Sequence, residues 1–308
     1  MSMLNSVFGR CLAAPLLCGL VLLTGCEKKL PRDSAEATIA SARQAVLDGH
    51  ANQLGDFLYA DNEEMKKLFA RVGRLLLNIQ KLGSSVQERF PEDAAKLKAD
   101  AEESAKQGKP VGLLSQMSTL MGQGGGRRRG RDLGNAADPA KQAAARKAFD
   151  EAIKRFFADP YSFLRESEGK LVAVPLGDDT AALTWEGKPV LPPIGMVMRK
   201  ADDGRWYFVL PTDLPGISGM MPKTKDQYQI LGGLIQVFDN VVIDLRKDVD
   251  SGQVKSMDEL ARRTGEKAFV PAAIAFFAYA KYENEQKQLA KQAASPAEAK
   301  TPAPPGGK

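Results

Sequence analysis

The sequence has little of the chemistry on which many enzymes depend. Its three cysteines, Cys11, Cys18 and Cys26, all lie near the start of a 308-residue chain, so the remainder contains no disulfide and no thiolate metal site. His50 is the only histidine, which excludes a site built from several histidines. No Walker A loop, Gly-x-Ser-x-Gly elbow or His-Glu-x-x-His motif occurs. We therefore expect no cofactor and no metal, and we lean against an enzyme.

An excess of one charge is also missing. The 43 Lys and Arg residues face 38 Asp and Glu residues, which gives a net charge of +5. The stretch 127–132 (RRRGRD) supplies four arginines and one aspartate, so a large part of that excess is local. A protein that binds duplex nucleic acid needs a broad basic face, and we therefore expect no nucleic-acid partner.

The first 25 residues have the features of an export signal. Arg10 precedes an apolar run over residues 11–23, which as a helix would span about 20 Å, too short for a bilayer core. The run ends in Leu23-Thr24-Gly25-Cys26, which resembles the lipobox of bacterial lipoproteins. The resemblance implies that Cys26 receives a lipid and becomes the first residue after cleavage. An ordinary secretory signal followed by an incidental cysteine is the alternative.

The same resemblance implies a location. Stable anchoring takes two or more acyl chains, which is what the lipoprotein modification provides. In enterobacterial lipoproteins an Asp after the lipidated cysteine favours the inner membrane, and this chain has Glu27. We therefore expect a cell-envelope protein anchored through Cys26, with the periplasmic face of the outer membrane favoured over the inner membrane. An envelope protein is the expected partner.

The chain after Cys26 divides into segments of different composition. Residues 26–33 read as a lipidated tether and residues 34–106 as a helical region, with Asp33 and Asp61 as expected caps and Gly83 as an expected helix end. Residues 107–137 are rich in Gly and Arg, which is typical of a flexible loop. An α+β region follows over 138–292, and residues 293–308 form a low-complexity, disordered tail.

From residue 169 the apolar period changes from that of a helix to that of a strand. Short turns separate four predicted strands, which indicates an antiparallel meander: Leu171–Leu176, Thr180–Glu186, Ile194–Lys200 and Arg205–Leu210. The alternation predicts a buried face that includes Val172, Val174, Leu183, Trp185, Met198 and Trp206.

Helices are predicted again after the strands. A long apolar stripe predicts a helix over 225–250 that backs the sheet. Ser256 with Glu259 is a capping pair that opens a short helix, which Gly265 closes, and Pro271 begins the last helix. The predicted fold is α+β: a helical N-terminal part, a four-stranded antiparallel meander sheet backed by a long helix, and C-terminal helices.

The order of helices followed by a meander has a second resemblance. Val46-Leu47-Asp48-Gly49 at the end of the first helix and Gly204-Arg205-Trp206-Tyr207 in the last strand are similar to the cone superfamily of ketosteroid isomerases and nuclear transport factors. The resemblance implies a curved sheet around a small-ligand pocket. No catalytic Asp of that superfamily can be placed here, so it implies at most a fold.

The candidate site residues each have a functional and a structural interpretation. The arginines of the Gly/Arg stretch either belong to a solvated linker or contact anionic lipid or polysaccharide: Arg127, Arg128, Arg129 and Arg131. Methionines outside the apolar stripes either form an adaptable partner surface or pack normally: Met117, Met121, Met220 and Met221. Among these, Met220 and Met221 lie in a Pro/Gly loop and are the preferred partner surface.

Three further residue types could carry chemistry. His50 is either a base or a loop residue after Gly49, and Trp185 and Trp206 either stack on a ligand or belong to the core. Glu186 is the only carboxylate on the wetter face of the predicted sheet, and it sits at a turn. We expect a non-catalytic interaction or assembly protein, and a ligand-binding or enzymatic cone domain is the alternative. A deep pocket with converging polar groups would favour the alternative, and an exposed apolar patch would favour interaction.

Overall fold

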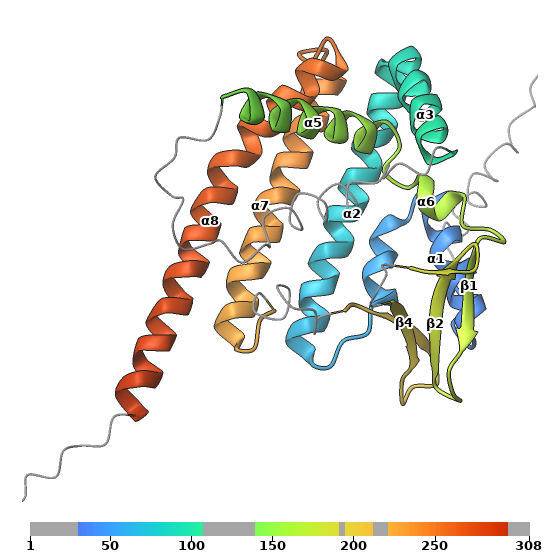
Figure 1. Cartoon of the computed structure of the whole chain (residues 1–308), viewed down its shortest axis with the longest axis vertical. Coiled ribbons are helices and arrows are strands. Elements are labelled where there is room, and N and C mark those ends of the chain that lie inside the picture. Colours follow the sequence, from blue (N-terminus) through green and yellow to red (C-terminus); the bar gives the residue numbers. More distant parts are fainter. Residues whose placement is uncertain (1–29, 107–138, 191–194, 212–220, 295–308) are drawn as a thin grey trace, which may run out of the picture. The chain divides into compact units, whose positions relative to one another are not determined.

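The structure, a computed structural model, describes residues 30–106, 139–190, 195–211 and 221–294. The chain from Pro31 onward is one compact unit. It combines one antiparallel sheet with long helices before and after it, so the predicted α+β class is confirmed (Figure 1). The leader, Cys26 and the Gly/Arg stretch at 107–137 lie outside the described residues.

The first helix, α1 (Ala35–Leu47), is fixed to the sheet at its start. Ser34, rather than the predicted Asp33, caps the helix by accepting a hydrogen bond from the Ala37 N–H at 3.0 Å. The carbonyl of Arg32 accepts from the Trp206 N–H at 2.8 Å, and that of Pro31 accepts from the Ser41 hydroxyl at 2.6 Å. The main chain is therefore held in place from Pro31, inside the segment that the sequence assigns to the tether.

The sheet is the predicted meander with the predicted number of main strands. These are β1 (Leu171–Pro175), β2 (Thr180–Trp185), β4 (Met196–Lys200) and β5 (Trp206–Val209), in the order β1-β2-β4-β5, and the two-residue β3 (Lys188–Pro189) pairs with β2. Its inner face packs on Ala35 and Ile39 of α1. The sheet is thus covered by α1, whereas the helix over 225–250, which we expected there, packs on another helix.

The prediction was wrong about which face of β1 is buried. Val172 pairs with Thr184 and Val174 with Ala182, and the two valines are 44% and 43% exposed. Leu171 and Ala173 are buried instead. Because residues 171–174 are all apolar, a period of two cannot show which pair faces the core.

The helical half contains α2 (Glu63–Arg89), α3 (Pro91–Lys106), α5 (Pro139–Ala158), the short α6 (Ser162–Arg165), α7 (Lys225–Asp250) and α8 (Met257–Ala294). In Figure 1, α2, α7 and α8 lie side by side and α5 crosses one end of them, which agrees with the contacts between these helices. The largest core cluster lies where they converge and includes Leu82, Val86, Phe157, Leu245, Leu260 and Val254. The predicted bounds of the helix over 225–250 are confirmed.

Three predicted helix boundaries are interior positions in the structure. Gly83 lies inside α2, and a Cβ there would meet two ring carbons of Pro160 at 2.9 Å, so this glycine allows close packing rather than ending the helix. Gly265 and Pro271 both lie inside the single helix α8. Pro271 removes one backbone hydrogen bond, yet the helix continues beyond it for another 23 residues to Ala294.

A short 3-10 helix, η1 (Ala51–Phe57), joins the sheet half to the helical half. Its backbone touches that of α2, because a Cβ at Gly73 would lie 2.2 Å from the Asn52 carbonyl oxygen. A Cβ at Gly55 would lie 2.3 Å from the Phe69 carbonyl oxygen. Only glycine at both positions permits this approach.

This contact predicts different outcomes for two helical glycines. Gly73→Ala should lower the free energy of unfolding by about 3 kcal/mol, because backbone must move to admit the methyl group. Gly265→Ala in α8, where a Cβ would meet nothing within 4 Å, should raise it by about 0.5–1 kcal/mol through helix propensity. Urea unfolding of both variants measures the difference, and equal effects would contradict the close approach of η1 to α2.

Candidate interaction surface

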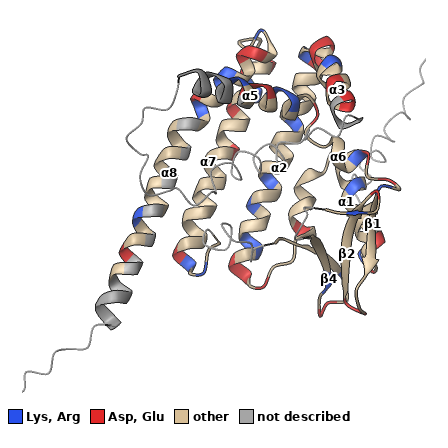
Figure 2. Ribbon diagram, viewed as in Figure 1, with Lys and Arg blue, Asp and Glu red and all other residues tan. Residues whose placement is uncertain are grey.

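The middle of α8 is apolar on all sides. No charged residue occurs from Ala268 to Ala280, and this stretch shows neither blue nor red in Figure 2. A helix that is apolar all round is normally buried. In α8, however, Val270, Ile274 and Phe277 are 57%, 65% and 70% exposed. Steps of four and three place these side chains on one side of the helix, where they form an exposed apolar row about 10 Å long, the α8 stripe.

Charged residues continue the α8 stripe at both ends. Before it, the Arg262 guanidinium donates to Glu266 at 2.7 Å, and after it Lys281 lies 3.8 Å from Glu285. All four side chains are more than half exposed. Each end of the stripe therefore presents one cation and one anion.

A shallow groove runs beside the α8 stripe, between α7 and α8. Its lining combines apolar and polar side chains from both helices: Val237, Asn240, Val241, Asp244, Lys267 and Pro271. The groove is open to solvent and does not enclose a small molecule.

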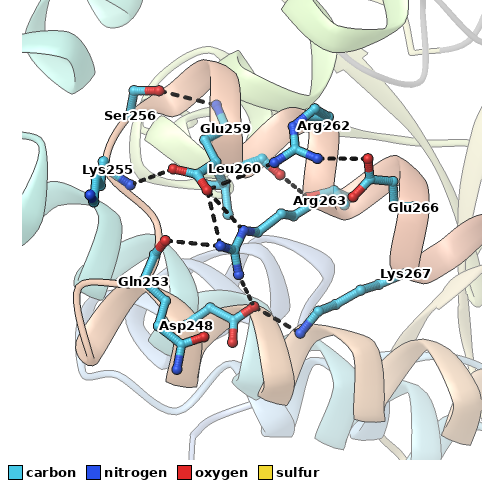
Figure 3. A network of polar contacts seen from close by, with 11 residues as sticks. Asp248, Gln253, Lys255, Ser256, Glu259, Leu260, Arg262, Arg263, Glu266 and Lys267 are labelled. Atoms are coloured by element: carbon cyan, nitrogen blue, oxygen red, sulfur yellow. Dashed lines mark hydrogen bonds and ion pairs between the residues drawn. The ribbon is translucent and has the colours of Figure 1, made fainter.

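A network of charged groups holds α8 against the end of α7 (Figure 3). Asp248 of α7 accepts from Arg263 at 3.2 Å and from Lys267 at 2.8 Å. Arg263 also donates to Glu259 from Nε and Nη2, at 3.1 and 3.0 Å, and to the Gln253 carbonyl at 3.0 Å. The first two turns of α8 are thereby tied to the loop that precedes them.

Hydrogen bonds at the start of α8 and further along it add to this network. The predicted capping pair is present, because the Ser256 hydroxyl accepts from the Glu259 N–H at 3.1 Å. The Glu259 carboxylate in turn accepts from the Lys255 N–H at 3.0 Å. Further along, the Tyr282 hydroxyl lies 3.2 Å from that of Thr224, the N-cap of α7. Helix α8 therefore runs antiparallel to α7 along most of its length.

The network also shifts the pKa values of its carboxyls. Burial alone would raise the pKa of Asp248, but the bonds from Lys267 and Arg263 outweigh it and hold the pKa below the ordinary 3.8. The Lys255 N–H, followed by Arg263, lowers the pKa of Glu259. Both carboxyls are thus stabilised in their charged form.

The outer face of the sheet carries a second exposed apolar group, with Val172 and Val174 joined by Leu176, which is 64% exposed.

The neighbouring edge of β1 is poorly suited to pairing with a strand from another molecule. The Leu176 N–H donates to Thr180 within the hairpin, so the odd-numbered residues turn their backbone outward. Leu171 already donates to Ser167 and Pro175 has no N–H, which leaves one outward donor in β1, that of Ala173.

A second depression, lined by residues of α1, α2 and the segment around α6, has polar side chains with structural roles. Gln80 accepts from the Ala51 N–H at 3.1 Å and donates to the Val46 carbonyl at 2.7 Å. The Tyr161 hydroxyl donates to the Leu76 carbonyl at 2.6 Å, and burial raises the pKa of Tyr161. Arg165 pairs with Asp159, and burial lowers the pKa of Arg165. These groups hold the fold rather than converge on a ligand.

The residues singled out from sequence do not meet in one site. His50 is exposed and precedes η1, and its backbone N–H donates to the Ala45 carbonyl at 2.7 Å. Glu186 is exposed at a turn with a positive φ of 49°. Trp206 is buried in the sheet core, and Trp185 packs against that core while stacking on Phe163 at 4.7 Å between ring centroids.

The remaining candidates fall mostly outside the described residues. Met221 is half-buried. Nothing is described for Cys26, Met117, Met121, Met220, Arg127, Arg128, Arg129 and Arg131. The α8 stripe was not predicted from the sequence, although the apolar run from Ala268 to Ala280 was a signal for it. The prediction began a new helix at Pro271 and so divided a run that lies on one helix.

Comparison with known proteins gives no relative. No family model, curated protein or solved structure matches the chain. Within the described ranges no helix is long and apolar enough to cross a membrane, and no cluster of His, Cys, Asp or Glu is suited to a metal ion. The lipoprotein and cone resemblances stay predictions, and the surface of α8 has to be interpreted from its own chemistry.

The Asp248 network predicts a pH-dependent contribution to stability. Asp248→Asn should lower the free energy of unfolding by about 1–3 kcal/mol at neutral pH, because two charged donors lose an ionised acceptor. The folded-state pKa lies below 3.8, so this contribution is present above 3.8 and is lost as pH falls through the folded value. Urea unfolding at about pH 7 and about pH 2 measures it.

The control for this prediction is Asp250→Asn on the same helix. Asp250 lies 3.9 Å from Arg246 and is half exposed, so its loss should cost less than about 0.5 kcal/mol. The difference in the free energy of unfolding between Asp248→Asn and the unaltered protein should disappear at acid pH. A difference that stays constant down to acid pH would mean that Asp248 contributes by packing and not by charge.

Proposed function

We propose that the protein is a lipid-anchored, non-catalytic protein of the bacterial cell envelope that binds a protein partner through α8. The observation that carries this proposal is the sequence Leu23-Thr24-Gly25-Cys26 at the end of the apolar leader. Only residues 27–30 separate Cys26 from Pro31, where the main chain becomes fixed. That length of chain spans at most roughly 18 Å, so a lipid on Cys26 keeps the folded unit at the bilayer surface.

The same segment also indicates which membrane holds the protein. Two or more acyl chains on Cys26 give stable anchoring, which a single chain does not. Glu27 follows the cysteine where an Asp would favour the inner membrane. The proposal therefore places the protein on the periplasmic face of the outer membrane in preference to the inner membrane.

The interaction role is supported by the α8 stripe. Exposed apolar side chains that lie together on one helix are costly in water and mark binding surfaces in soluble domains. Val270 and Ile274 are both more than half exposed although α8 is firmly attached to α7 on its other side. Neither of the two depressions described above gathers a nucleophile, a base and an oxyanion donor, which an enzyme would need.

The cone alternative receives no such support. It requires a pocket between the sheet and its helix, and that space is filled by Ile39, Met198 and Trp206, which are at most 9% exposed. A small ligand would have to displace this packing. We therefore propose no second function.

The anchor has a direct test. Cys26→Ala should abolish metabolic labelling with radioactive palmitate and leave the precursor uncleaved or mislocalised, because the thiol is the attachment point. The fractionation of labelled cells into soluble and membrane material measures both effects. Retention of label in Cys26→Ala would overturn the lipoprotein assignment, and Cys18→Ala, which lies in the leader, serves as the matched control that keeps its label.

The interaction role has a separate test. The double change Val270→Ser and Ile274→Ser should weaken partner retention at the membrane by roughly tenfold or more, because it removes two exposed apolar contacts. Its thermal midpoint should stay near that of the unaltered protein, since both side chains face solvent. Leu176→Ser, an equally exposed apolar residue on the sheet, is the control and should retain the partner.

A further inference from the structure

We infer that the partner of the α8 stripe is the α8 stripe of a second copy of this chain, packed antiparallel to it. The inference rests on the proposed interaction role of α8, and the geometric match between the two helices does not depend on the lipid on Cys26. Its basis is the order of apolar and charged residues along the exposed side of one helix.

An antiparallel arrangement makes the stripe complementary to itself. With the two-fold axis beside Ile274, Val270 of one copy lies opposite Phe277 of the other, and the two Ile274 side chains meet near the axis. Each copy thus contributes three exposed apolar side chains to one continuous contact. The shallow groove beside the stripe gives the edges of that contact room to interdigitate.

The charged residues select the direction of the second helix. In the antiparallel register, Glu266 lies opposite Lys281 of the second copy, and Arg262 lies opposite its Glu285. Symmetry repeats both pairs at the other end, so the apolar centre is bordered by opposite charges throughout. A parallel arrangement would place Glu266 against Glu266 and Lys281 against Lys281, which repel each other.

The small number of apolar side chains in the contact predicts a weak dimer. The row from Arg262 to Glu285 is about 35 Å long as a helix. Three apolar side chains a copy give limited binding energy in dilute solution. Confinement of both copies to one membrane raises their effective concentration and favours association.

The sheet edge offers a second route to self-association that the structure disfavours. Strand β1 has one outward N–H donor, that of Ala173, and ends in Pro175. An added β1 strand from another copy would therefore form few ladder hydrogen bonds. The α8 stripe has no such block.

Cysteine crosslinking tests both the partner and its direction. Full-length Val270→Cys and Phe277→Cys chains with different tags are expressed together, and isolated membranes are treated with a disulfide-forming oxidant. The mixed disulfide between the two variants should be the dominant product. Val270→Cys alone should give little, because antiparallel helices place its two copies about 10 Å apart along their axes, beyond disulfide reach.

The controls isolate the introduced thiols. The chain has no cysteine after Cys26, so the unaltered protein reports any background from Cys26 itself. Leu176→Cys on the sheet is the matched exposed position and should give no dimer above that background. Strong homodimers from Val270→Cys alone would show a parallel pair, and no dimer with any α8 variant would show that α8 does not bind a second copy. Either result overturns the inference.

A charge exchange tests the proposed register. Lys281→Glu places a glutamate opposite Glu266 of the second copy and should lower the yield of the Ile274→Cys crosslink roughly tenfold. Adding Glu266→Lys to the same chain should restore the yield, since opposite charges again face each other across the axis. Both changes place like charges four residues apart within α8, next to Arg262 and Glu285, so better helix stability cannot explain the rescue.

The outcomes separate this inference from the proposed function. If no α8 crosslink forms while Val270→Ser and Ile274→Ser still release a different bound protein, the second copy is excluded and the interaction role of α8 stands. If neither effect is seen, both this inference and the interaction role of α8 are wrong, and the lipid anchor is decided by its own test. Circular dichroism and thermal unfolding of each variant confirm that a lost crosslink is not due to a lost fold.

Discussion

The contact between the backbones of η1 and α2 is the constraint on which the arrangement of the two halves depends. Gly55 and Gly73 each face a carbonyl of the opposite element at a distance that no side chain allows. Since η1 follows α1 and precedes the bridge from Leu58 to Phe208, its position fixes the sheet relative to α2. A methyl group at either glycine would therefore act on the whole unit.

The other side of α2 is fixed by a buried polar contact, which in turn determines what α8 exposes. Asp239 of α7 is 1% exposed and accepts from Arg74 Nε at 3.1 Å and from Asn78 Nδ2 at 2.6 Å. Such a buried carboxylate tolerates few alternative registers, because a shift would leave it without donors. With α7 placed, α8 is held by Asp248 at one end and Thr224 at the other. Its outer side contributes nothing to these contacts, so the exposure of Ile274 there is not explained by folding.

The sequence predicted the fold class, four main strands and the helix over 225–250, because periodicity and turn residues are local signals. It did not predict that Gly83 and Gly265 lie inside helices, since a glycine that admits a close neighbour looks the same as one that ends a helix. The buried face of β1 was equally hidden, because all four residues over 171–174 are apolar. The surface of α8 was missed for a related reason. Whether the side chains of an apolar run are exposed depends on the elements that pack against them, and the run itself does not show which elements these are.

The proposed lipid anchor and the proposed antiparallel pair of α8 helices would together determine how α8 lies relative to the membrane. The two-fold axis of an antiparallel helix pair is perpendicular to both helices. Two copies whose lipids enter the same leaflet are related by an axis along the membrane normal, because only that rotation returns the membrane to itself with the same side facing the protein. In such a dimer α8 lies parallel to the bilayer plane. At most roughly 18 Å of main chain separates Cys26 from Pro31, so a lipid on Cys26 would keep each copy close to the bilayer without setting the direction of α8. The proposed anchor would thus limit how far the folded unit stands from the bilayer, and the proposed antiparallel pairing would set the direction of α8.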